Sequence, residues 1–202
     1  MNSDLAEYLQ PNEWVNSDNP AIIACAQRLS QNAEDAVAAT RNLYHFVRDE
    51  IAHSWDVQRP EVNGTASQVL SDGHGICYGK SHLLAALLRA VKIPSGISYQ
   101  KLTLFDDPKD GYAIHALNTV YLTELDRWIR LDARGNKLGV DARFSLEEER
   151  LAFPIRPSHG ERDYCINHAT PHPVVAETLR ANTNCLEMYR NGLPTDLEYP
   201  LK

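Results

Sequence analysis

The chain has 202 residues, and 20 Lys and Arg against 27 Asp and Glu give it a formal net charge of −7. With 43% hydrophobic and 23% charged residues it has a globular composition, which excludes a largely disordered chain. The basic residues are scattered, which argues against nucleic acid as a partner, and no apolar run reaches the roughly 20 residues of a membrane span. The length predicts a single domain, residues 1–202.

The cysteines and the N-terminal residues together predict a compartment. Cys25, Cys77, Cys165 and Cys185 form no CxxC pair and no dense pairing pattern. The N-terminal residues contain no basic and apolar leader, so we expect a cytoplasmic protein with reduced thiols and no membrane partner. A cysteine that is not needed for a disulfide is available for chemistry.

The N-terminal part is predicted to be helical. Asp18-Asn19-Pro20 has the residues of a helix start, with proline in the first turn, and the helix is expected to end near Ser30. Asn32 and Asp35 resemble a second cap. They precede apolar residues that recur at helical spacing over residues 37–51.

The next zone alternates between extended and helical signals. Residues 51–57 are expected to be extended, and residues 65–70 predict a short capped helix. The glycine-rich run 71–76 is typical of a turn. A long helix follows over 77–91. Its apolar stripe consists of Leu83, Leu84, Leu87, Leu88 and Val91.

The following residues predict β-structure and then loops. Residues 96–105 have the composition of a strand, and 114–122 with 127–131 are typical of a hairpin. Residues 136–202 are rich in proline and are expected to wrap over or cap the core as loops. One helix is predicted within them, over 174–190.

Cys77 is the candidate nucleophile. It lies at the first turn of the predicted buried helix, where the free backbone N–H groups favour the thiolate, the nucleophilic form. The same groups could bind the oxyanion that forms when a thiolate attacks an acyl carbon. A small buried hydrophobe is the other interpretation of such a cysteine. Glycines at 73, 75 and 79 permit close backbone approach and favour the nucleophile.

His115 and Asp132 are the candidate base and orienting acid that a thiolate nucleophile requires. His115 lies at the start of one predicted strand and Asp132 at the end of the next. Folding the hairpin brings the two positions opposite each other to within a couple of residues. A purely structural His–Asp pair is the alternative interpretation.

These residues resemble the transglutaminase-like superfamily of papain-like thiol enzymes. Residues 75–94 carry the G-x-C start, the small residue, the leucine stripe, the arginine and the Ile-Pro of its nucleophile helix. His115-Ala-Leu-Asn resembles its histidine strand, and Trp128-Ile-Arg-Leu-Asp132 resembles its W-x-x-x-D segment. The resemblance covers about residues 65–135.

The resemblance implies an α+β fold with a transglutaminase-like or papain-like core. Its nucleophile helix packs on an antiparallel β-sheet, a helical N-terminal part precedes it, and the core covers about residues 32–135. It implies a thiol-dependent amidase or peptidase acting on carboxamide or peptide bonds through a Cys77 thioester. Peptide or protein substrates are therefore expected. The chain has no clear acidic calcium loop, and no metal or other cofactor is expected.

A second oxyanion donor and the cleft walls are less well defined. The superfamily uses an upstream side-chain donor, for which Trp55 and Gln68 are the candidates. Trp55 as core or cleft wall and Gln68 as helix surface are the alternatives. Tyr78 and His74, which lie beside Cys77 in sequence, are candidates for lining the cleft or for ordinary packing.

Two alternatives to hydrolysis and one metal site stay open. Acyl transfer to an amine would use the same thioester, and a transglutaminase-like binding module would use none of this chemistry. The sequence does not predict the substrate's identity or the oligomeric state. A zinc site would need ligands from the C-terminal part but lacks the usual CxxC pair. Its candidate ligands are His159, Cys165, His168, His172 and Cys185.

Overall fold

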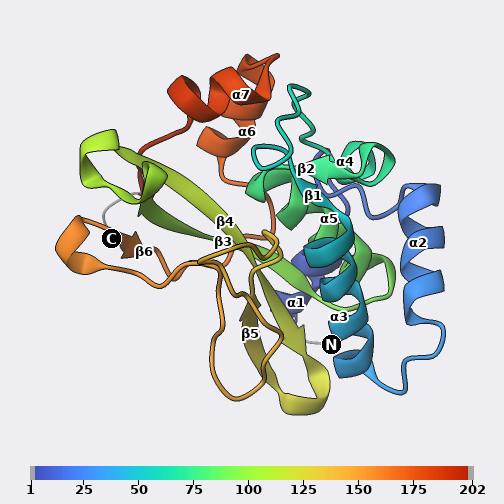
Figure 1. The fold of residues 1–202 in the computed structure, drawn as a ribbon. Coiled ribbons are helices and arrows are strands. Elements are labelled where there is room, and N and C mark those ends of the chain that lie inside the picture. Colours follow the sequence, from blue (N-terminus) through green and yellow to red (C-terminus); the bar gives the residue numbers. More distant parts are fainter. Residues whose placement is uncertain (1–2, 200–202) are drawn as a thin grey trace.

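A four-stranded antiparallel sheet and one helix packed against it, α5 (Cys77–Ala90), form the centre of the computed structural model, which describes residues 3–199. The strands run in the order β5-β4-β3-β6. Figure 1 shows α5 between this sheet and the helices α2 and α3. The sheet consists of β3 (Ser95–Thr103), β4 (Tyr112–Leu122), β5 (Arg127–Leu131) and β6 (Arg162–Asp163). The short helical turns are η1 (Glu7–Leu9), η2 (Phe46–Glu50), η3 (Leu104–Asp106), η4 (Pro108–Asp110), η5 (Thr123–Leu125), η6 (Pro157–His159) and η7 (Met188–Gly192).

Local caps define the N-terminal helices. After the short α1 (Ser3–Ala6), α2 (Pro20–Ser30) begins as predicted, because the Asn19 side chain accepts the N–H of Ala21. α3 (Ala36–His45) is capped by Asp35, whose Oδ1 accepts the N–H of Ala38 at 2.7 Å. The cap residue is therefore Asp35, and the prediction of a cap at Asn32 is wrong.

The segment before α5 is only partly extended. Strand β1 (Ala52–His53) pairs in parallel with β2 (His74–Gly75), and residues 54–58 form turns instead of the expected strand. Between them, α4 (Ala66–Asp72) has the predicted cap, a reciprocal capping box between Thr65 and Gln68. Gly73 ends α4 in the left-handed conformation, with a φ of 72°.

Helix α5 is buried on all sides from its first residue to Arg89. Four of its polar side chains, Tyr78, Lys80, His82 and Arg89, donate to backbone carbonyl oxygens of the surrounding segments. Arg89, 1% exposed, donates to the carbonyl oxygens of Ser95 at 2.6 and 3.0 Å, Gln10 at 2.6 Å and Ala169 at 2.7 Å. One guanidinium thus joins the N-terminal segment, the start of β3 and the chain after β6.

The predicted hairpin is confirmed as β4 and β5. Their register pairs Asn118 with Leu131 and Leu122 with Arg127. Alternate β4 side chains such as Asn118 face α5, where its Nδ2 donates to the carbonyl oxygen of Ser81 at 2.9 Å. Asp132 follows directly after β5, so the hairpin delivers it to the same region of the sheet as His115.

The C-terminal residues differ from the prediction of one helix over 174–190. The chain forms α6 (Pro173–Ala181) and, after a break, α7 (Cys185–Glu187), which continues into η7. Asn182 has extended φ/ψ values and Asn184 caps the next helix by accepting the N–H groups of Leu186 and Glu187. Within residues 3–199, no helix combines the length and apolar character that crossing a membrane requires.

The role of Arg89 can be tested by its removal. Arg89→Ala leaves carbonyl oxygens of three segments without their donor, and we expect a loss of about 3 kcal/mol or more in the free energy of unfolding. Urea unfolding measures it. Arg143→Ala is the control, because Arg143 is exposed and pairs only with nearby Asp141, so it should cost about 0.5 kcal/mol or less. Equal losses in the two variants would contradict the assignment.

Candidate active site

Cys77 lies at an open helix N-terminus. Ile76 is the N-cap residue and provides no side-chain cap, and the first bond of the helix joins the N–H of Lys80 to the carbonyl oxygen of Ile76 at 3.0 Å. The N–H groups of the first turn are therefore free of intrahelical bonds. Gly79 is required in that turn, because a side chain there would collide with the carbonyl oxygen of Asn63. Cys77 itself is 8% exposed.

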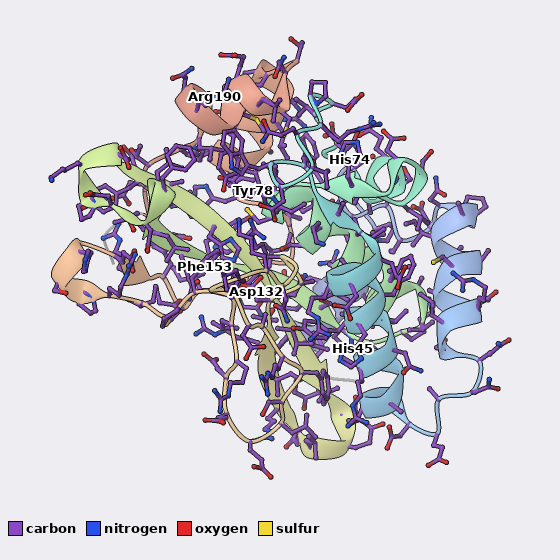
Figure 2. All side chains as sticks on the ribbon, viewed as in Figure 1. His45, His74, Tyr78, Asp132, Phe153 and Arg190 are labelled. Carbon is purple, nitrogen blue, oxygen red and sulfur yellow. The ribbon has the colours of Figure 1, made fainter. Side chains whose placement is uncertain are left out.

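His115 and Asp132 form the predicted pair. His115 Nε2 lies 2.7 Å from Asp132 Oδ2. The carboxylate also accepts the backbone N–H of Arg134 on Oδ1 at 3.0 Å and that of Ala152 on Oδ2 at 3.1 Å. Phe153 packs edge-on against the His115 ring, with 5.2 Å between centroids. Figure 2 shows Asp132 and Phe153 near the middle of the molecule, where the sheet meets α5. The orientation of His115 is thus held by both the carboxylate and the aromatic ring.

The charges of this pair stabilise each other. Burial lowers the pKa of His115, but the charge of Asp132, its hydrogen bond and a hydrogen bond with Cys77 outweigh burial and raise this pKa to about 10. Burial raises the pKa of Asp132, but His115 and the two backbone N–H groups bring it below its ordinary value. At neutral pH the pair is therefore an imidazolium and a carboxylate, with the sulfur of Cys77 beside the imidazolium.

A cavity of about 510 Å³ opens onto Cys77 and His115. Its walls come from β1 and the turn after it, from β3 and β4, and from the chain after β5. They combine apolar side chains such as Phe153 and Leu193 with charged ones such as Arg134 and Glu161. The C-terminal segment is tied to the sheet here, because the N–H of Ile114 donates to the carbonyl oxygen of Pro194 at 2.9 Å. A substrate carbonyl at Cys77 would therefore be enclosed on one side by residues 189–194.

The four residues predicted as oxyanion donors or cleft walls lie in different environments. Trp55 lines the cavity and stacks on Tyr189, with 4.5 Å between ring centroids. Gln68 lies outside it, exposed, with Oε1 accepting the N–H of Thr65 in the α4 cap. Tyr78 is buried behind Cys77 and donates to the carbonyl oxygen of Ile114 at 2.8 Å. His74 is buried against Ser54, so of these four residues only Trp55 reaches the cavity.

Sequence reasoning missed His53, which also lines the cavity. It is 5% exposed, and its Nδ1 has no hydrogen-bond partner within the described part of the chain. The sequence pattern around His53 could have indicated this position. Residues 51, 53 and 55 alternate in a run expected to be extended, so His53 shares a face with Trp55.

An ion-pair network joins the cavity wall to the end of β5. Arg134 donates from both terminal nitrogens to Asp56, at 2.6 and 2.9 Å, and Lys137 donates to the same carboxylate at 2.8 Å. Burial opposes ionisation of Asp56, but the two cations lower its pKa to about 2. The turn that carries Trp55 is thereby fixed to the residues after Asp132.

The candidate zinc ligands of the C-terminal part do not come together as a metal site among the described residues. His168 Nε2 lies 3.1 Å from the Tyr199 hydroxyl, His172 Nδ1 accepts the N–H of Val174, and the Cys165 thiol contacts Asp163. In the part of the chain that the structure describes, no three histidine, cysteine or acidic side chains lie close enough together to hold a metal ion.

Comparison with known proteins identifies the fold. A family model for the transglutaminase-like superfamily matches residues 23–133, more than half of the chain. A candidate cysteine protease from Cytophaga hutchinsonii is similar in structure, with a TM-score of 0.56 and 19% identity over 66% of this chain and 43% of that chain. The expected α+β fold is thereby confirmed.

A second similar structure is the periplasmic domain of TgpA from Pseudomonas aeruginosa, with a TM-score of 0.46 and 23% identity over 62% of this chain and 45% of that chain. The chain thus spans less than half the length of either solved chain. No curated protein matches the sequence.

The charge state of His115 should depend on Asp132. In Asp132→Asn the burial and the contact with Cys77 remain but the negative charge of the carboxylate is gone, so the pKa of His115 should fall well below 10. Titration of the histidine ring resonances by NMR measures it. His82 is the control in the same spectra, because burial without a carboxylate lowers its pKa to about 4 in both proteins.

The same shift predicts the pH dependence of stability. The folded-state pKa of His115 lies above its unfolded value and that of Asp132 below its own, so the stability that the pair contributes is complete between the ordinary values of 3.8 and 6.5. It is lost as the pH rises through 10, where His115 loses its proton, and again in acid, where Asp132 gains one. The stability difference between wild type and Asp132→Asn should shrink over both of these pH ranges. An unchanged His115 titration in the variant would contradict both expectations.

Proposed function

Because the chain belongs to the transglutaminase-like superfamily, we propose that it is a thiol-dependent amidase or peptidase that cleaves carboxamide or peptide bonds through a Cys77 thioester. One observation carries the proposal: a single cavity holds a cysteine at an open helix N-terminus beside a buried, carboxylate-paired histidine. A thiol used only for packing would need neither the free N–H groups nor the charged pair.

The first step forms the acyl-enzyme. His115 holds the proton of the Cys77 thiol, and the thiolate attacks the carbonyl carbon of the substrate. A C–S bond forms, and the negative charge that develops on the carbonyl oxygen is stabilised by the N–H groups at the start of α5. His115 then gives its proton to the departing nitrogen as the C–N bond breaks, so that an amine leaves and a thioester remains.

The second step returns the enzyme to its starting state. Neutral His115 takes a proton from water as the water oxygen attacks the thioester, and the C–S bond breaks to release a carboxylic acid and Cys77. Asp132 stabilises each imidazolium that forms and keeps Nε2 of His115 occupied, which leaves Nδ1 for the proton transfers. The cavity combines apolar and charged side chains, which suits the backbone and mixed side chains of a peptide or protein substrate.

The proposal predicts unusual reactivity of Cys77. Iodoacetamide should alkylate Cys77 readily near pH 6, and His115→Ala should slow the reaction at that pH by about ten-fold or more. Rates are read by mass spectrometry from about pH 5 to 9. Asp132→Asn should also slow the alkylation of Cys77, because it removes the negative charge that stabilises the His115 imidazolium.

Cys165 provides an internal control in the same protein. It is exposed, and partial burial and the Asp163 carboxylate raise the pKa of its thiol, so it should react only at high pH in every variant. If Cys77 shows the same profile as Cys165, or does not respond to His115→Ala, the catalytic proposal fails. The cavity would then be better interpreted as the site of a binding module.

Hydrolysis and acyl transfer can be separated without knowing the natural substrate. p-Nitrophenyl acetate should acetylate Cys77, and in the presence of methylamine the acetyl group should leave mainly as acetate. The cavity that contains Cys77 shares no lining residue with the second surface cleft, at Ser98 and Trp128, so that cleft does not lead an amine to the thioester. Formation of N-methylacetamide faster than acetate would establish an acyltransferase instead.

A further inference from the structure

We infer that His53 is a catalytic residue of the proposed reaction, the side-chain donor that hydrogen-bonds the substrate's carbonyl oxygen as it becomes an oxyanion. The inference rests on the proposed function of Cys77. It takes precedence over the earlier candidates, because Gln68 lies outside the cavity and Trp55 lies in the turn beyond the last residue of β1 that pairs with β2.

The position of His53 is fixed relative to the nucleophile by the backbone. Strands β1 and β2 pair His53 with Gly75, two residues before Cys77. Hydrogen bonds on both sides hold this register: the N–H of Ala52 donates to the carbonyl oxygen of Gly73 at 2.9 Å, and the N–H of Ser54 donates to that of Gly75 at 3.2 Å. The His53 ring therefore belongs to the same rigid unit as the start of α5.

The ring has a polar atom that the fold does not use. Buried polar atoms nearly always have a hydrogen-bond partner, and one without a partner costs about 1–3 kcal/mol. His53 Nδ1 is such an atom among the described residues, and it has no exposed surface, so it faces the protein interior. Nε2 forms no hydrogen bond with the described residues and is not among the fully buried atoms, so it is the ring nitrogen left to face the Cys77 cavity that this side chain lines. A ring kept here for packing alone would be replaced at lower cost by an apolar one, since it already lies edge-on to Tyr189 with 6.0 Å between centroids.

The charge state of His53 suits a donor and not a second base. Burial and the charge of Arg134 hold its pKa well below the ordinary value, so the ring is neutral at pH 7. A neutral imidazole keeps one N–H to donate. Because it is a very weak base, it does not compete with His115 for the Cys77 proton. A neutral donor in a site closed to bulk water stabilises a developing oxyanion without transferring a proton to it.

The test compares two reactions of the same sulfur. Iodoacetamide transfers a CH₂ carbon to Cys77 with loss of iodide and forms no oxyanion. p-Nitrophenyl acetate passes through a tetrahedral oxyanion before p-nitrophenolate leaves and acetyl-Cys77 remains. His53→Phe should lower the acetylation rate about 10²–10³-fold and change the alkylation rate by less than about two-fold. Both products are followed on the Cys77 peptide by mass spectrometry.

Two further variants separate a donor from a structural residue. His53→Gln keeps an N–H donor of similar reach and should recover part of the acetylation rate. Trp55→Phe removes the indole N–H but keeps an aromatic ring against Tyr189, and its effect on acetylation should be much smaller than that of His53→Phe. Far-UV circular dichroism and thermal melting confirm that each variant is folded.

The results distinguish a failure of the His53 role from a failure of the proposed function. Unchanged acetylation in His53→Phe, an equal fall of acetylation and alkylation, or a larger loss in Trp55→Phe would overturn the role of His53 while leaving the proposed function intact. If wild type is acetylated no faster at Cys77 than at exposed Cys165, the proposed function fails and the role of His53 fails with it.

Discussion

The complete burial of α5 is the constraint on which the rest of the structure depends. An apolar helix could be buried by packing alone, but this one carries four long polar side chains into the core. Tyr78, Lys80, His82 and Arg89 each donate to a backbone carbonyl oxygen of another segment. Those bonds are required because an unpartnered buried donor is costly, and they determine where β4, the end of η2, the chain before α4 and the N-terminal segment must lie.

The same helix leaves its N-terminus free, and the site is built around it. Ile76 offers no cap, so the first N–H groups have no partner within the helix, next to a cavity that contains the Cys77 thiol. The other α-helices from α2 onward have side-chain caps at their starts, as Asn19, Asp35 and Thr65 show. An open start at the buried central helix is the exception, and it is where anionic groups are stabilised most strongly.

Two histidines in one cavity have opposite charge states for a simple reason. His115 and His53 are both buried, and burial alone lowers the pKa of each. His115 has a carboxylate at 2.7 Å, while the charge with the largest effect on the pKa of His53 is the cation of Arg134. One ring is therefore charged and suited to proton transfer, and the other is neutral and suited to donating a hydrogen bond. The carboxylate of Asp132 is the reason why the two buried rings differ in charge state.

The sequence by itself determined the elements whose signals are local. The caps at Asn19 and Thr65, the helix from Cys77 and the hairpin between β4 and β5 all follow from residues a few positions apart, and the hairpin was enough to bring His115 to Asp132. Only the tertiary structure decided which side chains complete the cavity. His53 arrives through a two-residue parallel pairing, and Phe153 and Tyr189 arrive from the proline-rich part, where no periodic pattern indicates a face. Such contacts depend on pairing between distant segments, whose energies come from burial in the folded state and not from local propensity.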